Sequence, residues 1–219
     1  EVLPLLPSVT LLVQVPDDSG NALLPDAVRY DDLLAEGSTD PLDLELSPDD
    51  LYILYTGGTT GMPKGVLWRQ HDIFMSAMGG RPFGADKALE SYDELVEQAR
   101  TNMGVRTVLM IPPLMHGAAQ WAVFNVVSTG GWIAIPDHVD HLDAESALRL
   151  AERERVLSIP VVGDAVARPL LDEIETGKYD LSGLVTVTNG GAPLSPTVRD
   201  RLLAALPNLM VIDAVGSSE

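Results

Sequence analysis

A short loop rich in glycine and threonine is the part of this chain with the clearest capacity for chemistry. It spans residues 55–66 and reads Tyr-Thr-Gly-Gly-Thr-Thr-Gly-Met-Pro-Lys-Gly-Val. A loop with so little side-chain bulk offers many free backbone N–H groups, and this one adds threonine hydroxyls and one lysine. We therefore expect it to bind a polyphosphate. The residues that we predict to do so are Thr56, Gly57, Gly58, Thr59, Thr60, Gly61 and Lys64.

The loop is not a Walker A motif, in which a Gly-Lys-Ser/Thr triplet opens a helix. Pro63 disfavours helical backbone at Met62, so we expect Lys64 in extended or turn backbone. The apolar run at residues 51–55 predicts a strand that leads into the loop. The alternative interpretation is a flexible surface turn, which a bare Gly-Gly-Thr-Thr-Gly would favour. The preceding strand and the Pro-Lys-Gly order favour phosphate binding.

Three further turns, at residues 112–116, 189–195 and 216–219, also follow apolar runs that predict strands. From residue 51 onward, strand patterns alternate with helical patterns, which predicts an α/β fold with mostly parallel sheets and flanking helices. Ligands of such sheets gather at the carboxyl ends of the strands. We therefore expect the three turns and the Gly/Thr loop to line one shared cleft.

The elements that must position these turns can be placed from periodicity and capping residues. Asp143 predicts the start of one helix, and Ser195 followed by Pro196 predicts the start of another. We expect helices near residues 71–78, 92–100, 116–127, 143–155, 164–175 and from 195 onward. We expect strands near residues 9–15, 51–55, 107–111, 131–135, 156–159, 184–188 and 210–215.

Composition and charge exclude several classes of function. The net charge of −18 argues against a partner made of nucleic acid or anionic membrane. The chain has no cysteine, which excludes disulfides, thiolate metal sites and a cysteine nucleophile, and which fits a cytoplasmic setting. It contains no apolar run of about 18 residues, so we expect no transmembrane segment. Its 46% hydrophobic residues can form a globular core.

The four segments, in this order, resemble those of the adenylate-forming superfamily, which includes acyl-CoA synthetases, luciferases and the adenylation domains of peptide synthetases. The resemblance covers residues 51–219, which we interpret as the AMP-binding core of the large N-terminal domain of an acyl-CoA synthetase. It implies that Lys64 and residues 56–61 hold the β- and γ-phosphates of ATP. Residues 1–50 form an acidic N-terminal segment with a β-like run.

The other two nucleotide segments take their roles from the same resemblance. Residues 189–195 resemble the segment whose backbone frames adenine, and residues 213–219 resemble the segment that ends in Gly-x-Thr-Glu. In the family, this threonine contacts the α-phosphate and the glutamate binds Mg²⁺. The nucleotide-binding residues implied here are Gly190, Gly191, Ala192, Pro193, Asp213, Ala214, Val215, Gly216, Ser217 and Ser218, with Ser218 also catalytic and Glu219 both catalytic and the metal ligand.

Two departures from the family pattern are informative. Gly57 stands where the family usually has serine, and Val215 stands where it usually has tyrosine. One phosphate-facing hydroxyl and one aromatic surface for adenine are therefore absent. Together with residues 65–70, Gly-Val-Leu-Trp-Arg-Gln, these variants resemble a branch of actinobacterial acyl-CoA ligases that includes enzymes for steroid side-chain acids.

The resemblance implies that the whole protein uses ATP to convert a carboxylic acid to an acyl-adenylate and then forms a thioester with coenzyme A. We expect the acyl pocket near residues 113–124. No charged residue lies between Pro112 and Val127, which favours an apolar acyl chain. The alternative is that these residues are the core of a buried helix. The substrate-binding residues that we predict are Met115, His116, Ala119, Trp121 and Gly190, and His116 is also a predicted catalytic residue, with a core histidine as the alternative.

Several further expectations concern the rest of the protein, alternative functions and the remaining histidines. The resemblance implies family elements before and after it, including a C-terminal domain with a catalytic lysine, so we expect the isolated chain to be inactive. A non-catalytic nucleotide-binding module and an adenylating enzyme that serves a carrier protein stay open as alternatives, and so does a homodimer. His138 and His141 lie beside acidic residues, but without further histidine or cysteine nearby a solvated acidic loop is the favoured interpretation.

Overall fold

The computed structural model describes residues 3–17, 19–57, 62–82 and 85–218, and the chain divides into two compact units, Glu1–Leu46 and Ser47–Glu219. In the first unit, a 3-10 turn at Leu3–Leu5 precedes two short strands that pair in parallel and one short helix. These are β1 (Leu12–Gln14), β2 (Ala27–Arg29) and α1 (Tyr30–Glu36). The strand β1 lies inside the run predicted as β-like, whereas β2 and α1 were not predicted.

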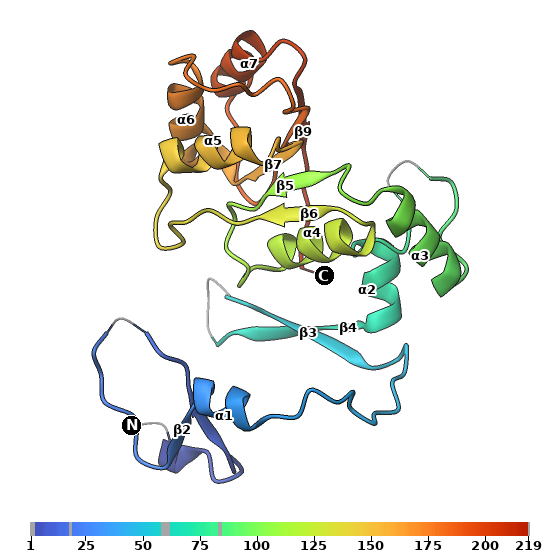
Figure 1. The fold of residues 1–219 in the computed structure, drawn as a ribbon, viewed down its shortest axis with the longest axis vertical. Helices are drawn as coiled ribbons and strands as arrows, with labels where there is room; N and C mark the ends of the chain where they lie inside the picture. Colours follow the sequence, from blue (N-terminus) through green and yellow to red (C-terminus); the bar gives the residue numbers. More distant parts are fainter. Residues whose placement is uncertain (1–2, 18, 58–61, 83–84, 219) are drawn as a thin grey trace. The chain divides into compact units, whose positions relative to one another are not determined.

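A five-stranded parallel sheet forms the centre of the second unit (Figure 1). The strands lie in the order β6-β5-β7-β8-β9, and each neighbouring pair is parallel. Their bounds are β5 (Thr107–Leu109), β6 (Trp132–Ala134), β7 (Ser158–Val161), β8 (Thr186–Asn189) and β9 (Met210–Asp213). The carboxyl ends of all five strands therefore lie along the same edge of the sheet.

Helices cover both faces of this sheet, which confirms the predicted α/β class. Side chains of α5 (Ala144–Arg153), α6 (Gly163–Ile174) and α7 (Pro196–Ala205) form the larger buried cluster, together with Leu109 of β5. A smaller cluster joins α4 (Gly117–Ser128) to the residues on either side of Leu109, Val108 and Met110. Since successive strand residues point to opposite faces, β5 contributes to both hydrophobic layers.

The predicted helix caps are present. Asp143 Oδ1 accepts a hydrogen bond of 3.0 Å from the backbone N–H of Ser146, at the start of α5. Ser195 Oγ accepts a bond of 3.4 Å from the N–H of Val198, and Pro196 occupies the first turn of α7. Each cap satisfies one of the N–H groups that a helix leaves unpaired at its start. Ser195 is thereby explained as a cap.

The Gly/Thr loop belongs to a separate antiparallel hairpin, which corrects the sequence-based expectation. The predicted strand is present as β3 (Leu51–Thr56), but it pairs with a strand that was not predicted, β4 (Lys64–Arg69). The expectation that all four turns follow strands of one parallel sheet is therefore wrong for this loop. The prediction of extended backbone at Lys64 is confirmed, because Lys64 is the first residue of β4.

Two short helices complete the second unit, α2 (Gln70–Ser76) directly after β4 and α3 (Tyr92–Thr101). Both were predicted within two residues. The helix predicted at residues 116–127 is α4, but its side chains are mostly half-buried, with Ala119 and Val126 as its buried residues. Within the described ranges, no helix is long and apolar enough to cross a membrane.

Candidate functional site

Asn189, at the end of β8, connects three segments at the carboxyl edge of the parallel sheet. Its side chain is 5% exposed. The Oδ1 atom accepts a hydrogen bond of 2.7 Å from the N–H of Gly163, and Nδ2 donates bonds of 3.0 Å to the carbonyl of Ala192 and to Asp213 Oδ1. One buried amide therefore ties the start of α6 and the end of β9 to the turn after β8.

Gly163, the first residue of α6, allows this junction to pack closely. Its φ is +59°, and a Cβ at this position would lie 2.7 Å from the carbonyl oxygen of Pro193. A side chain would therefore be strained by its backbone conformation and would collide with the turn after β8. The next N–H, that of Asp164, donates to the same carbonyl at 3.2 Å.

Asp164 and Asp213 add charge to this junction. The backbone N–H of Ser195 donates to Asp164 Oδ1 at 2.8 Å, and this hydrogen bond is the largest cause that holds the pKa of the Asp164 carboxyl below its usual value. Asp213 Oδ2 forms an ion pair of 2.7 Å with Arg199 of α7. Both ion-pair side chains are exposed, so the pair orients Asp213 more than it stabilises the fold.

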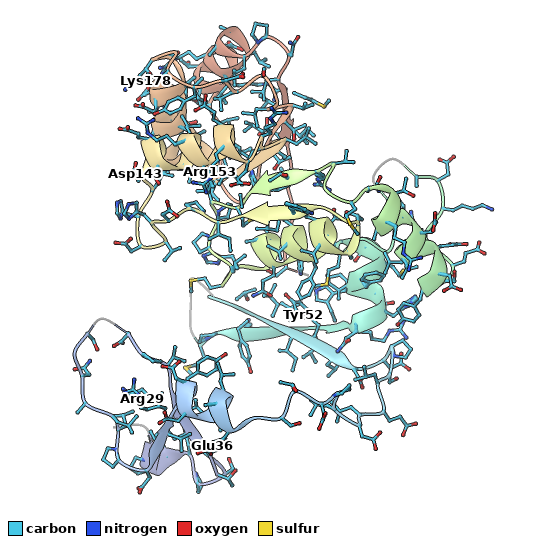
Figure 2. The ribbon with its side chains drawn as sticks, in the orientation of Figure 1. Arg29, Glu36, Tyr52, Asp143, Arg153 and Lys178 are labelled. Atoms are coloured by element: carbon cyan, nitrogen blue, oxygen red, sulfur yellow. The ribbon has the colours of Figure 1, made fainter. Side chains whose placement is uncertain are left out.

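The hairpin β3–β4 contacts the start of α4. Tyr52, labelled in Figure 2, points from β3 toward α4, and its hydroxyl donates to Gln120 Oε1. Leu54 is 5% exposed and lies against Gly117, where an added Cβ would be 2.3 Å from Leu54 Cδ2. The glycine at the first position of α4 therefore lets the hairpin approach the helix closely, one residue after His116.

The second strand of the hairpin contacts the segment that follows β9. The indole N–H of Trp68 donates a hydrogen bond of 2.8 Å to the carbonyl of Ser218. These residues are 150 positions apart in the chain. The strand that leaves the Gly/Thr loop is thus connected to the last predicted nucleotide segment.

Part of the predicted phosphate-binding loop can be placed. Thr56 and Lys64 are the last paired residues of the hairpin, and Thr56 Oγ1 donates to the carbonyl of Lys64 at 3.4 Å. Gly57 and Lys64 are exposed, which leaves the lysine side chain accessible to a ligand. Four further residues that we predict to bind phosphate lie outside the described residues: Gly58, Thr59, Thr60 and Gly61.

The other predicted nucleotide-binding residues flank Asn189 and extend from β9. The N–H of Gly190 donates to the carbonyl of Val161 at 3.2 Å, and the N–H of Ala214 donates to the carbonyl of Asn189 at 2.8 Å. The turn after β8 and the segment after β9 are therefore brought together. Glu219 lies outside the described residues. Exposure is high or intermediate at Gly190, Gly191, Ala192, Pro193, Asp213, Ala214, Val215, Gly216, Ser217 and Ser218.

The predicted substrate residues of the α4 region have different environments. Met115 is 75% exposed, and His116 is the exposed N-cap residue of α4. Ala119 is 2% exposed and belongs to the cluster between α4 and the sheet. Trp121 is half-buried, and within the described part of the chain its buried indole N–H has no hydrogen-bond partner. Met115, His116 and Trp121 can therefore face a ligand more readily than Ala119.

An apolar cavity of about 450 Å³ lies between the segments that follow β5 and β6. Pro113 and Leu114 line it on one side, and residues 135–136 and 138–143 line it on the other. It therefore includes the beginning of the predicted acyl region, whereas the predicted residues Met115, His116, Ala119 and Trp121 are not part of its lining.

Two residues that hold this arrangement together were not predicted as site residues. Asn189 was predicted only as the first residue of the segment that resembles the adenine-framing turn, and its side chain was given no role, because asparagine is common in turns for purely local reasons. Trp68 was noted only as part of residues 65–70, which resemble a branch of actinobacterial acyl-CoA ligases. Burial of an asparagine at the end of a central strand is the signal that would have identified Asn189, and burial requires the fold.

Comparison with known proteins identifies relatives along the whole chain. The family described as AMP-binding enzyme matches residues 3–219. The medium-chain acyl-CoA ligase Mig of Mycobacterium avium is 53% identical over 219 residues, and the 3-oxocholest-4-en-26-oate–CoA ligase of Rhodococcus rhodochrous is 38% identical over 226 residues. Both matches cover 100% of this chain and 40% of the relative, so the chain spans well under half the length of these curated relatives.

Solved structures show the same fold. The N-terminal domain of FACL13 from Mycobacterium tuberculosis superposes with a TM-score of 0.69 at 22% identity, over 90% of this chain and 45% of that one. The long-chain-fatty-acid-CoA ligase FadD1 from Archaeoglobus fulgidus gives a TM-score of 0.64 at 22% identity, over 86% of this chain and 36% of that one. At these identities the likeness concerns the fold.

Proposed function

The chain belongs to the family of AMP-binding enzymes, and on this premise we propose that the whole protein is an acyl-CoA ligase. The carboxylate of the substrate attacks the α-phosphorus of ATP and pyrophosphate leaves, which gives an acyl-adenylate. The thiol of coenzyme A then attacks the acyl carbonyl and AMP leaves. Catalysis of this kind requires positioning and charge neutralisation, and no nucleophile from the protein.

The observation that carries this proposal is the position of the hairpin between two other predicted segments. Its strand β3 contacts α4 next to His116, and its strand β4 contacts the carbonyl of Ser218. A triphosphate at the Gly/Thr loop would therefore lie near the segments proposed for the acyl carbonyl and the α-phosphate. This arrangement supports the proposal that these segments act together in adenylation.

We propose for the individual residues the roles that the resemblance to the adenylate-forming superfamily implies. Lys64 and residues 56–61 hold the β- and γ-phosphates, and His116 lies between the acyl carbonyl and the α-phosphate. The turn at residues 190–193 frames adenine, and Ser218 contacts the α-phosphate. Asn189 is a positioning residue, since its buried amide fixes the turn after β8 against Asp213.

We propose an apolar acid as the substrate. The cavity next to Pro113 and Leu114 is lined mainly by apolar side chains, and α4 carries no charged residue. The names of the relatives, which specify a medium-chain acyl group and a steroid side-chain acid, support the same class. A fatty acid or a steroid side-chain acid is the substrate class that we expect.

Several finer expectations stay predictions. Mg²⁺ would be bound by Glu219, which lies outside the described residues, and would neutralise phosphate charge. The cytoplasmic setting, the homodimer and the inactivity of the isolated chain also stay predictions.

A screen of carboxylic acids with the full-length protein tests the function. ATP–pyrophosphate exchange and pyrophosphate release are measured for fatty acids, steroid side-chain acids and amino acids, with and without coenzyme A. We expect exchange with the apolar acids and thioester only when coenzyme A is present. Nucleotide binding without exchange would support a non-catalytic module, adenylate without thioester would support a carrier-protein acceptor, and a signal from amino acids alone would contradict the pocket.

A further inference from the structure

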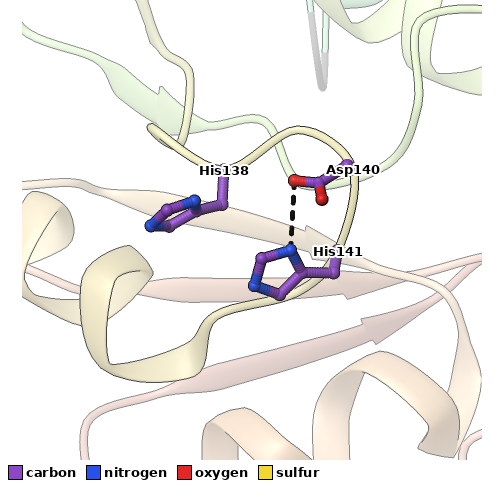
Figure 3. Close-up of side chains that lie close together, drawn as sticks. All are labelled: His138, Asp140 and His141. Atoms are coloured by element: carbon purple, nitrogen blue, oxygen red, sulfur yellow. Dashed lines mark ion pairs between the residues drawn. The ribbon is translucent and has the colours of Figure 1, made fainter. Parts of the chain in front are cut away.

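Three side chains that can bind a metal gather on the loop between β6 and α5, apart from the proposed nucleotide site. They are His138, Asp140 and His141, and one ligand atom from each lies within 4.8 Å of the other two (Figure 3). His141 Nδ1 is 3.0 Å from Asp140 Oδ1, and the two imidazole rings lie 5.1 Å apart at an interplanar angle of 35°. All three residues are exposed, so an ion could reach them from solvent.

A fourth possible ligand atom, from Asp143, lies close to His138. Asp143 uses Oδ1 to cap α5, and its other oxygen, Oδ2, is 3.9 Å from His138 Nε2. The cap fixes the Asp143 carboxylate, and β6 fixes the other end of the loop through its pairing with β5. Both ends of the loop are thus held by regular structure, which lowers the ordering cost of binding an ion.

We propose that His138, Asp140 and His141 form a surface site for a divalent transition-metal ion, with an oxygen of Asp143 as the fourth ligand. Two imidazole nitrogens with carboxylate oxygens suit zinc, nickel or copper, whereas magnesium and calcium prefer sites made of oxygen alone. The sequence by itself favoured a solvated acidic loop. The structure adds the convergence of the two rings and the carboxylate, which the i, i+3 spacing of the histidines does not require.

The site has a direct relation to the apolar cavity, because all four of its residues line that cavity. An ion bound there would connect residues 138–143 to one another and restrict the movement of one cavity wall. This consequence does not depend on the proposed acyl-CoA ligase activity.

Zinc binding to the full-length protein, without nucleotide, tests the proposal. Zn²⁺ is titrated calorimetrically, and Co²⁺ is used as a spectroscopic probe whose visible absorption reports nitrogen ligation. We expect wild-type protein to bind Zn²⁺ saturably, and we expect His138→Ala and His141→Ala each to weaken that binding at least about tenfold and to diminish the Co²⁺ bands. Magnesium is expected to compete poorly.

The control is His71→Ala, since His71 is an exposed histidine at the start of α2 and outside the cluster. This variant should bind Zn²⁺ as the wild type does. Because all three substituted histidines are exposed, each variant should keep the wild-type melting temperature without metal. Unchanged affinity in His138→Ala and His141→Ala, or an equal loss in His71→Ala, would overturn the proposal.

Discussion

Replacement of Asn189 by alanine is predicted to destabilise the second unit strongly, because one buried side chain satisfies three groups. The variant leaves the N–H of Gly163 without its acceptor in a buried environment, and it removes the donors to the carbonyl of Ala192 and to Asp213. The sheet itself would keep its backbone pairing, since β8 pairs with β7 and β9 through the main chain.

The size of the effect follows from these contacts. A buried donor without a partner costs about 1–3 kcal/mol, and each lost hydrogen bond to a partly exposed group costs about 0.5–1.5 kcal/mol. We expect a total loss of roughly 2–4 kcal/mol in the free energy of unfolding, below the simple sum because the groups next to the protein surface regain contact with water. For a domain of about this size, that loss lowers the melting temperature by roughly 5–15 °C.

Thermal unfolding followed by circular dichroism and by calorimetry measures this shift. The matched control is Asn102→Ala, since Asn102 is an exposed asparagine at the end of α3, where we expect a change within about 0.5 kcal/mol. If Asn189→Ala melted together with the wild type and with this control, the interpretation of Asn189 as the connector of three segments would be refuted.

Three further substitutions test the contact of β4 with Ser218, the close packing at Gly163 and the proposed role of Lys64. Trp68→Phe removes the N–H that donates to the carbonyl of Ser218, so we expect a higher KM for ATP with a loss of only about 1 kcal/mol in stability, measured by exchange kinetics and melting. Gly163→Ala places a methyl group 2.7 Å from a backbone carbonyl oxygen at a φ of +59°, and should destabilise the protein by about 1–3 kcal/mol in urea unfolding. Lys64→Ala should lower kcat/KM in pyrophosphate exchange at least about 100-fold, whereas the exposed Lys87→Ala should leave it unchanged; similar values for the two variants would contradict the role of Lys64.

The sequence predicted most readily those elements whose signals are local. The side chain of Asp143 and the Ser195-Pro196 pair identify two helix starts, because capping involves residues within one turn. Tertiary context decides the boundaries of β7, which the sequence placed at residues 156–159 and which the structure has at Ser158–Val161. Proline weakens a strand prediction, so the predicted strand ended before Pro160, whereas the observed strand continues to Val161.

The strand β4 and the role of Asn189 could not be predicted from local patterns. Lys64 and Gly65 are poor strand formers, and β4 exists because β3 supplies six consecutive partners. The sequence placed Asn189 in the adenine-framing segment but did not indicate the partners of its side chain, which come from α6, the turn after β8 and the end of β9. These contacts depend on how distant segments meet, which pattern and propensity do not encode.

The register of the hairpin determines on which face of the two strands Lys64 lies. Thr56 lies opposite Lys64 in the last residue pair of the hairpin. Because strand side chains alternate between faces, a slip of one residue would turn the lysine to the opposite side of the hairpin. Tyr52 and Trp68 form another pair of the same ladder, and they bond to Gln120 and Ser218 respectively. These two side-chain contacts, each four residues from the Thr56–Lys64 pair, therefore help to set the face on which the positive charge of Lys64 lies.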